Sequence, residues 1–100
     1  MPLYSLARFR VHADTRQAAE QAMFDHTSAV RRDLAAIMVT IFRDPERPSH
    51  YSAMIRANEA KAEQAYRAVL QQALASHLDG EIEWEHSELV TSSDLQRRHR

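Results

Sequence analysis

The stretch Leu34–Phe42 constrains the fold more than any other, because it is the longest apolar run in a chain of 100 residues. A strand with one exposed face alternates apolar and polar residues. This stretch does not alternate, so both of its faces need cover. Its second half is rich in β-branched and aromatic residues, and Pro45 follows it. These features favour a strand over the alternative, a buried helix.

The composition excludes several classes of protein. A chain of this length forms one domain, and a net charge of −1 gives no reason to expect binding to nucleic acid. No run approaches the length of a membrane span, so we expect no membrane contact. The absence of cysteine excludes disulfides and thiolate chemistry, and it fits a cytoplasmic location. A single glycine, Gly80, excludes glycine-rich phosphate loops.

Six elements are expected, in the order strand, helix, strand, strand, helix, strand. They are a strand at Tyr4–His12, a helix from Asp14 to about Arg32, the strand at Leu34–Phe42, a strand at His50–Ala57, a helix from about Glu59 to Leu78 and a strand at Glu81–Val90. Asp14 and Gln17 form an expected capping box for the first helix. Gly80 is expected to supply the left-handed residue after the second. The domain spans residues 1–90, and residues 91–100 form a polar tail.

This order predicts an α+β fold, a ferredoxin-like βαββαβ sandwich. Its antiparallel sheet has strand order 4-1-3-2, with both helices on one face. The Leu34–Phe42 strand then lies at an edge, where an apolar strand with an uncovered face is an aggregation hazard. A two-fold dimer that packs the open sheet faces together removes this hazard. We therefore predict a homodimer, a dimeric α+β barrel.

Three segments carry a resemblance to a known family. They are Leu6–Val11 with Asp14 after it, Val39–Pro45 before a hairpin that contains prolines, and Leu78–Ile82 before the last strand. With the element order, they resemble the antibiotic biosynthesis monooxygenase-like (ABM) superfamily over roughly residues 4–90. The resemblance implies a homodimer with a pocket between the helices and the sheet of each subunit. Several members oxidise phenols or quinols with oxygen and no added cofactor; others degrade haem, and many have no known activity.

The chain departs from the family at the positions that carry chemistry. The family often has a Glu-x-Trp before the second helix and a histidine within it. Those positions hold Ile55, Ala57 and Tyr66 here, so no catalytic residue is carried over. The resemblance therefore implies the fold and the dimer more than the reaction.

His26 is the candidate catalytic residue. It lies in the apolar stripe of the first expected helix, where an imidazole could act as a proton acceptor in a dry pocket with a shifted pKa. The alternative is a neutral, hydrogen-bonded histidine in the core or at the rim of the pocket.

Five further residues are candidates for substrate binding. Tyr66 and Trp84 would line a pocket for a flat ligand, or they belong to the core. Arg8 and Arg56, on the two central strands, would hold an anionic group or a phenolate, or they pair with glutamates across the dimer. Asn58 would offer its amide to the substrate, or it caps the second helix. The six histidines lack metal-ligand spacing, so neither a metal nor another cofactor is expected.

Two functions remain open. The first is a cofactor-independent monooxygenase-like protein that acts on a small aromatic, phenolic or quinol-type molecule, with His26 as the base. The second is a non-catalytic ligand-binding or dimerisation module on the same fold. A helix–sheet pocket filled by Met23, Phe24, Tyr66 and Trp84 would favour the module. A polyketide cyclase-type accessory protein is a third hypothesis.

Overall fold

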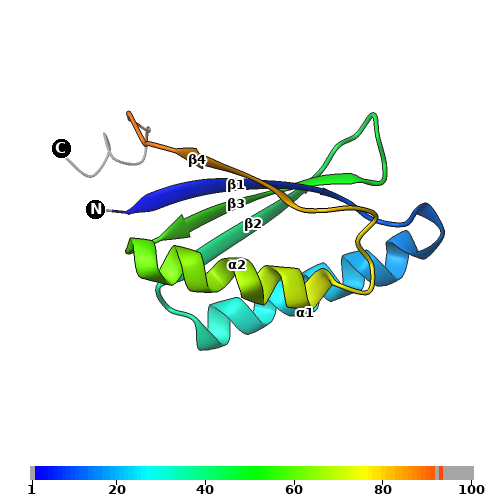
Figure 1. The fold of residues 1–100 in the computed structure, drawn as a ribbon, viewed down its shortest axis with the longest axis horizontal. Helices are drawn as coiled ribbons and strands as arrows, with labels where there is room; N and C mark the ends of the chain where they lie inside the picture. The colour runs from blue at the N-terminus through cyan, green and yellow to red at the C-terminus, as the bar shows by residue number, and fades with distance from the viewer. Residues whose placement is uncertain (1, 92, 94–100) are drawn as a thin grey trace.

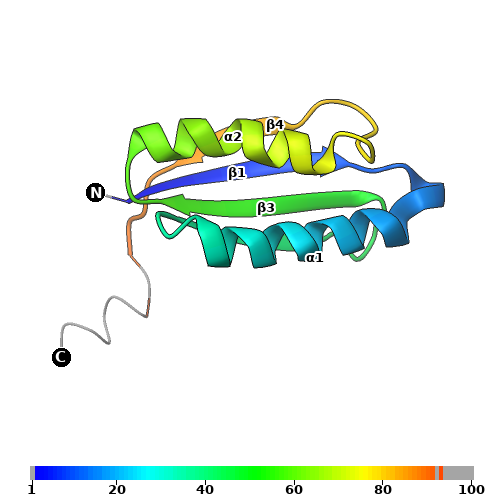
Figure 2. The ribbon, with the colours of Figure 1, turned by 90° about the horizontal axis from the view of Figure 1, so that it is seen from below.

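The computed structural model describes residues 2–91 and 93. Four strands form one antiparallel sheet in the order β2-β3-β1-β4, and two helices cover one of its faces (Figure 1, Figure 2). The elements are β1 (Leu3–Arg10), α1 (Arg16–Asp33), β2 (Ile37–Arg43), β3 (His50–Ala57), α2 (Ala60–Leu74) and β4 (Glu83–Ser87). This is the 4-1-3-2 order read from the other edge. The predicted ferredoxin-like βαββαβ fold is therefore confirmed.

The core lies between the sheet and the two helices. Strand β1 alternates, with Ala7 and Phe9 buried against the helices and Arg8 and Arg10 exposed on the opposite side. Strand β3 also alternates, because every second residue from Tyr51 to Ala57 is buried. The buried apolar residues are Ala7, Phe9, Val11, Ala19, Met23, Val30, Ile37, Tyr51, Ala53, Ile55, Ala57, Tyr66, Leu70 and Leu74.

Strand β2 is an edge strand, as predicted, but it begins at Ile37 rather than Leu34. The Leu34 N–H donates to the Val30 carbonyl at 2.8 Å, so this residue still closes the end of α1. Only one face of β2 is covered within the chain. Met38 and Phe42, on the other face, are 57% and 48% exposed.

The uncovered side of the sheet is called the open face below. Residues that pair directly across neighbouring strands share a face. Tyr4, for example, lies between Arg56 and Ser87, and Leu6 lies between Met54 and Glu85. The open face is formed by Tyr4, Leu6, Arg8, Arg10, Met38, Thr40, Phe42, His50, Ser52, Met54, Arg56, Glu83, Glu85 and Ser87.

The first helix begins later than expected. A short 3-10 helix, η1 (Ala13–Thr15), precedes α1, and the Thr15 N–H donates to the His12 carbonyl at 3.2 Å. Asp14 therefore lies inside η1 rather than at a helix N-cap. The predicted capping box of Asp14 with Gln17 is wrong.

The second helix ends four residues before the predicted Leu78. The chain after it pairs with the end of β1: the Asp79 N–H donates to the Arg10 carbonyl at 2.9 Å, and Leu78 forms a bridge with Val11. The Leu78 N–H still donates to the Leu74 carbonyl at 3.1 Å, so the chain turns from the helix to β1 at Asp79. Gly80 has the expected positive φ, +112°, but in the loop before β4 rather than at the helix end.

The last strand is also shorter than the predicted Glu81–Val90. Most of the expected polar tail, residues 92 and 94–100, lies outside the described residues. Among the described residues, no helix is both long and apolar enough to cross a membrane.

Candidate functional site

His26 and Tyr66 form a buried pair between the two helices. His26 is in the buried stripe of α1 and Tyr66 is in that of α2, with 7% and 1% of their surfaces exposed. His26 Nε2 lies 2.7 Å from Tyr66 Oη. The ring centroids are 5.6 Å apart and the ring planes are tilted by 37°. The sequence singled out both residues separately, and the fold brings them into contact.

Burial determines the protonation of this pair. It lowers the pKa of His26 below its ordinary 6.5, and it raises the pKa of the Tyr66 hydroxyl, because each charged form is poorly solvated there. The imidazole is therefore neutral near pH 7 and the tyrosine keeps its proton. With Nε2 protonated, the Nε2–H donates to Tyr66 Oη, which holds the ring in one orientation. Nδ1 then keeps the lone pair with which the imidazole can accept a proton.

Trp84 belongs to a different cluster, between α2 and the β1–β4 side of the sheet. The Arg67 guanidinium lies 4.7 Å from the centre of the Trp84 ring. Arg67 Nε donates to Glu63 Oε1 at 2.7 Å, and the Ser5 hydroxyl donates to the same oxygen at 2.9 Å. Arg67 also lies 2.7 Å from Nε2 of His86. This cluster is internally satisfied and links three elements.

Sequence reasoning missed the buried carboxylate at the centre of this cluster. Glu63 is 2% exposed, although glutamate is rarely buried without a partner. The sequence did carry a signal of this burial. Glu63 lies three residues before Tyr66 and seven before Leu70, so it continues the buried stripe of α2. The pattern could not identify its partners, because Ser5 lies 58 residues away in the sequence.

The two candidate arginines lie on the open face but apart from each other. Arg8 pairs with Ser52 in the β1–β3 ladder, and Arg56 pairs with Tyr4. They are separated by four residues along the ladder, or about 13 Å. Arg8 forms an exposed ion pair with Glu85 of its own chain at 3.1 Å.

Asn58 does not cap the second helix. The N-cap of α2 is Glu59, and no side-chain bond caps that end. The Asn58 backbone N–H instead donates to the Ala36 carbonyl at 3.1 Å, joining the end of β3 to the segment before β2. The cap interpretation is therefore wrong, and the Asn58 amide remains a candidate for ligand binding.

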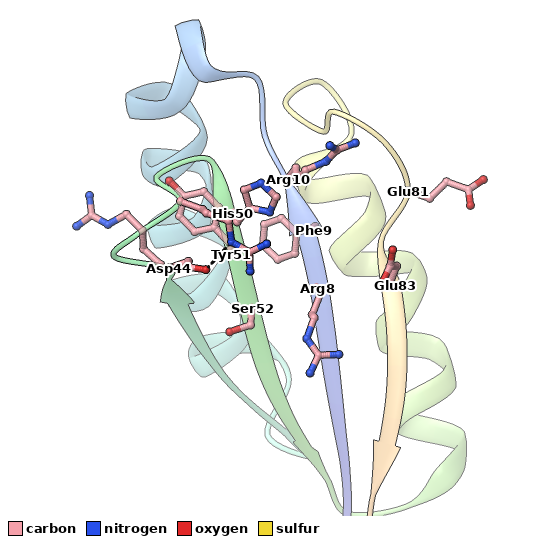
Figure 3. Close-up of a pocket in the computed structure, with 11 residues that line it drawn as sticks. Arg8, Phe9, Arg10, Asp44, His50, Tyr51, Ser52, Glu81 and Glu83 are labelled. Carbon is pink, nitrogen blue, oxygen red and sulfur yellow. Dashed lines mark hydrogen bonds and ion pairs between the residues drawn. The ribbon is translucent and has the colours of Figure 1, made fainter.

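At least three cavities are present in the described part of the chain. The first, about 820 Å³, lies at the hairpin end of the sheet, where Figure 3 shows Arg8, Arg10, His50 and Glu83 on neighbouring strands. It contains side chains of both charge signs, including the Arg47–Asp44 pair at 3.0 Å. The mixture gives no clear preference for a charged ligand.

The other two cavities lie along β2. One of about 470 Å³ is at the corner between the end of α1 and the start of β2. One of about 440 Å³ follows the strand toward its other end. Phe24, one of the four residues whose packing into the helix–sheet pocket would favour the module, instead lines this last cavity and is 67% exposed. Among the described residues that line the three cavities, His26, Tyr66 and Trp84 are absent.

A second tyrosine lies at the β2 side of the core. The Tyr51 hydroxyl donates to Glu20 Oε2 at 2.5 Å, and Arg43 lies 3.4 Å from the same oxygen. Burial, together with the Glu20 carboxylate, raises the pKa of Tyr51 to about 12. The hydroxyl therefore serves as a donor to Glu20 rather than as a base. Within residues 2–91 and 93, no three His, Asp or Glu side chains converge as a metal site.

Comparison with known proteins identifies the fold. No family model matches the sequence, and no curated protein matches it either. Solved structures do match. An antibiotic biosynthesis monooxygenase superposes with a TM-score of 0.75 at 12% identity, over 89% of this chain and 99% of that one.

Two further structures extend this result. A candidate antibiotic biosynthesis monooxygenase from Caulobacter crescentus gives a TM-score of 0.76 at 14% identity, over 90% of this chain and 91% of that one. A conserved protein of unknown function from Bacteroides thetaiotaomicron gives a TM-score of 0.70 at 17% identity, over 88% of this chain and 97% of that one. The predicted resemblance to the ABM proteins is thus confirmed at the level of the fold. Identities this low say nothing further about the reaction.

Proposed function

We propose that this protein is a cofactor-independent monooxygenase-like protein that acts on a small aromatic phenol or quinol, with His26 as the catalytic base. The observation that carries the proposal is the buried His26–Tyr66 pair. It combines a neutral imidazole, a fixed ring orientation and an apolar surrounding. Solved structures named as antibiotic biosynthesis monooxygenases share the fold, and the proposed class of reaction follows those names.

The proposed reaction uses oxygen as the only oxidant. His26 removes a proton from the hydroxyl or an activated ring carbon of the substrate, and the resulting anion passes one electron to oxygen. The substrate radical and superoxide combine to give a peroxide. Loss of water then leaves one oxygen atom in the product as a carbonyl and the other in water. A conjugated substrate supplies both electrons itself, so the proposal includes no cofactor.

Tyr66 would position the imidazole in this scheme, because its hydroxyl holds Nε2 at 2.7 Å. The other sequence candidates have separate places in the proposal. Trp84, with Arg67 over its ring, would pack against α2 and would not contact the ligand atoms that His26 contacts. Arg8 is engaged by Glu85, and Arg56 and Asn58 line a cavity apart from His26, so the proposal gives these three residues no contact with the substrate.

A second candidate function is a ligand-binding module without catalysis. The observation that favours it is the filling of the helix–sheet space by Met23 and Tyr66, both buried. His26 also lines none of the three described cavities. In this reading the pair is a core hydrogen bond and ligands bind elsewhere.

Oxygen consumption with an aromatic hydroquinone, corrected for its spontaneous oxidation, distinguishes the two functions. The enzyme hypothesis predicts turnover that falls about 100-fold or more in His26→Gln, the usual contribution of a general base. Tyr66→Phe should lose less turnover than His26→Gln, because it keeps the aromatic ring and removes only the hydrogen bond that positions the imidazole. His12→Gln, at an exposed position, is the control and should keep full activity. Unchanged turnover in His26→Gln would exclude His26 as the base, and no turnover in the folded wild type would favour the module.

We also propose that the chain forms a homodimer through its open face. Met38, Phe42 and Met54 are 57%, 48% and 47% exposed there, and a two-fold axis lets one such patch cover another. The absence of cysteine supports a cytoplasmic location for this assembly.

A further inference from the structure

The cavity at the corner between α1 and β2, called the corner cavity, has an unusual charge pattern. It measures about 470 Å³, within the range of small-molecule sites. Two arginines, Arg31 and Arg56, line it, and the described lining residues include no aspartate or glutamate. The other two described cavities contain carboxylates. Glu20 lines the cavity that follows β2, and Asp44 is among the carboxylates that line the cavity at the hairpin end of the sheet. The described residues that line the corner cavity therefore carry a net positive charge.

Neither arginine is neutralised by a neighbour. Within the described part of the chain, Arg31 and Arg56 form no ion pair, whereas Arg32, the residue next to Arg31, pairs with Asp33 at 3.2 Å. The C-terminal end of α1 favours a cation at Arg31. That effect does not explain Arg56, which comes from β3. Two arginines from different elements thus line one cavity, and neither forms an ion pair in the part of the chain that the structure describes.

A third polar group is available at the same cavity. Asn58 lines it, and its side chain forms no hydrogen bond with another described residue, because Glu59 takes the N-cap position of α2. Its backbone is fixed, because the Asn58 N–H donates to the Ala36 carbonyl at 3.1 Å. The amide can therefore donate to a ligand without first breaking an internal contact.

The remaining wall is apolar. Val30 and Ile37 are buried, and Leu34 and Val39 are partly buried against the core. A ligand with a hydrocarbon or aromatic body would remove the exposed parts of this wall from water. The cavity therefore combines an apolar wall with two unpaired guanidinium groups and a free amide.

We propose that the corner cavity binds a small carboxylic acid with an apolar or aromatic body. The carboxylate lies between Arg31 and Arg56, which suit it because a guanidinium donates two parallel N–H bonds to a carboxylate. The Asn58 amide adds a donor, and the body of the ligand packs on Val30 and Leu34. This site is separate from the His26–Tyr66 pair and does not rest on the proposed monooxygenase function.

The test is a titration with 2-naphthoate, followed by calorimetry and by backbone amide shifts. Wild-type protein should bind it, with the largest shifts at residues of the corner cavity. Arg31→Gln and Arg56→Gln should each weaken binding about tenfold or more, since each removes a charge-assisted pair. Arg32→Gln is the matched control: it removes the same charge one position away, outside the cavity, and should change affinity less than about twofold.

Two ligand controls define the chemistry. The uncharged 2-naphthamide should bind at least about tenfold more weakly, because it cannot accept the paired guanidinium bonds. Inorganic phosphate should also bind more weakly, because it lacks the apolar body. Met38 and Arg56 also belong to the open face, which the proposed homodimer covers. The solution mass is therefore measured for each titrated sample, so that binding is assigned to the monomer or to the dimer.

Ala35→Trp provides a variant that fills the cavity from an exposed position and should abolish binding without changing the core. The proposal is overturned if wild-type protein does not bind 2-naphthoate at millimolar concentration. It is also overturned if Arg32→Gln weakens binding as much as Arg31→Gln, or if the shifts lie elsewhere. His26→Gln should bind 2-naphthoate as the wild type does, which separates this result from the test of the monooxygenase.

Discussion

At the scale of single residues, His26 shows how an apolar surrounding changes a titratable group. The imidazole is nearly inaccessible to water and is held by one neutral hydroxyl, so its charged form is disfavoured. Two kinds of role follow from the same environment. A neutral imidazole is ready to accept a proton from a substrate, and a buried imidazole makes folding sensitive to acid.

The stability of the protein should depend on pH through His26. Its pKa in the folded protein is lowered by burial, so below its ordinary 6.5 the unfolded chain binds a proton that the folded protein resists. The free energy of unfolding should be highest above that pH and should fall as the pH drops through the window between 6.5 and the lower folded value. Urea unfolding at about pH 7.5 and about pH 5.5 measures this loss.

His26→Gln should be less stable overall, because Tyr66 loses its partner, but should lose less stability between the two pH values. His12→Gln, at an exposed position, should keep the wild-type dependence on pH. An equal loss in His26→Gln and in wild type would show that other groups cause the acid sensitivity.

The sequence identified the residues of the buried pair but not the pair itself. His26 was visible as a polar residue in an apolar stripe, and Tyr66 as an aromatic residue in another. Periodicity assigns each to a helix face, but it does not set the rotation and offset of one helix against the other. Those depend on how all the core side chains pack. The 2.7 Å contact between helices could therefore be seen only in the structure.

At the scale of elements, helix α2 is fixed to the sheet by a buried carboxylate as well as by apolar side chains. Glu63 lies in the first turn of α2, where the helix dipole favours an anion, and it accepts bonds from Ser5 of β1 and Arg67. Arg67 in turn covers Trp84 of β4. One side chain thus links the helix to two strands of the sheet.

Glu63→Ala should destabilise the protein by about 2–4 kcal/mol, because it leaves the Ser5 hydroxyl and the Arg67 guanidinium without their acceptor. Ser5→Ala should cost less, about 1 kcal/mol, since it removes only one bond. Gln64→Ala, at the next and exposed position, is the control and should stay within about 0.5 kcal/mol of wild type. Urea unfolding at fixed protein concentration measures all three. A value for Glu63→Ala near that of Gln64→Ala would contradict this role.

The ends of the elements were the part of the fold that local patterns predicted least well. Asn58 is a good capping residue by type, yet the helix begins two residues later. The segment at 77–79 looks helical by its apolar pattern, yet its backbone pairs with the end of β1. In both cases a backbone bond to a distant segment outweighed a local preference of about 1 kcal/mol.

At the scale of the whole molecule, the open face makes the single chain asymmetric. The helices cover one side of the sheet, and the other side carries Met38, Phe42 and Met54 in contact with water. The alternation of β1 and β3 and the apolar β2 were enough to predict this arrangement. They could not show what covers the face, since that depends on the surface of a second molecule.

The homodimer predicts a solution mass of twice the 11.5 kDa chain. Replacing Phe42 and Met54 together by lysine should give a monomer, because burying these charges in the interface would cost several kcal/mol. Both positions are about half exposed in the single chain, so the fold should persist, with an unchanged helical circular dichroism spectrum. Val69→Lys places the same charge on an exposed apolar position of α2 and should leave the dimer intact.

Sedimentation equilibrium over a range of concentrations measures these masses. Wild-type protein that stays at the mass of one chain throughout would contradict the dimer. A dimer that survives both lysines would place the interface on another surface.

The pairing of β1 also has a consequence for synthesis. β1 leaves the ribosome before both of the strands that pair with it, β3 and β4. Its apolar side chains therefore lack these partners until β4 has been synthesised, a period in which a chaperone could bind them. The only tryptophan lies in β4 beneath Arg67. Its fluorescence would report when the last strand docks and that waiting period ends.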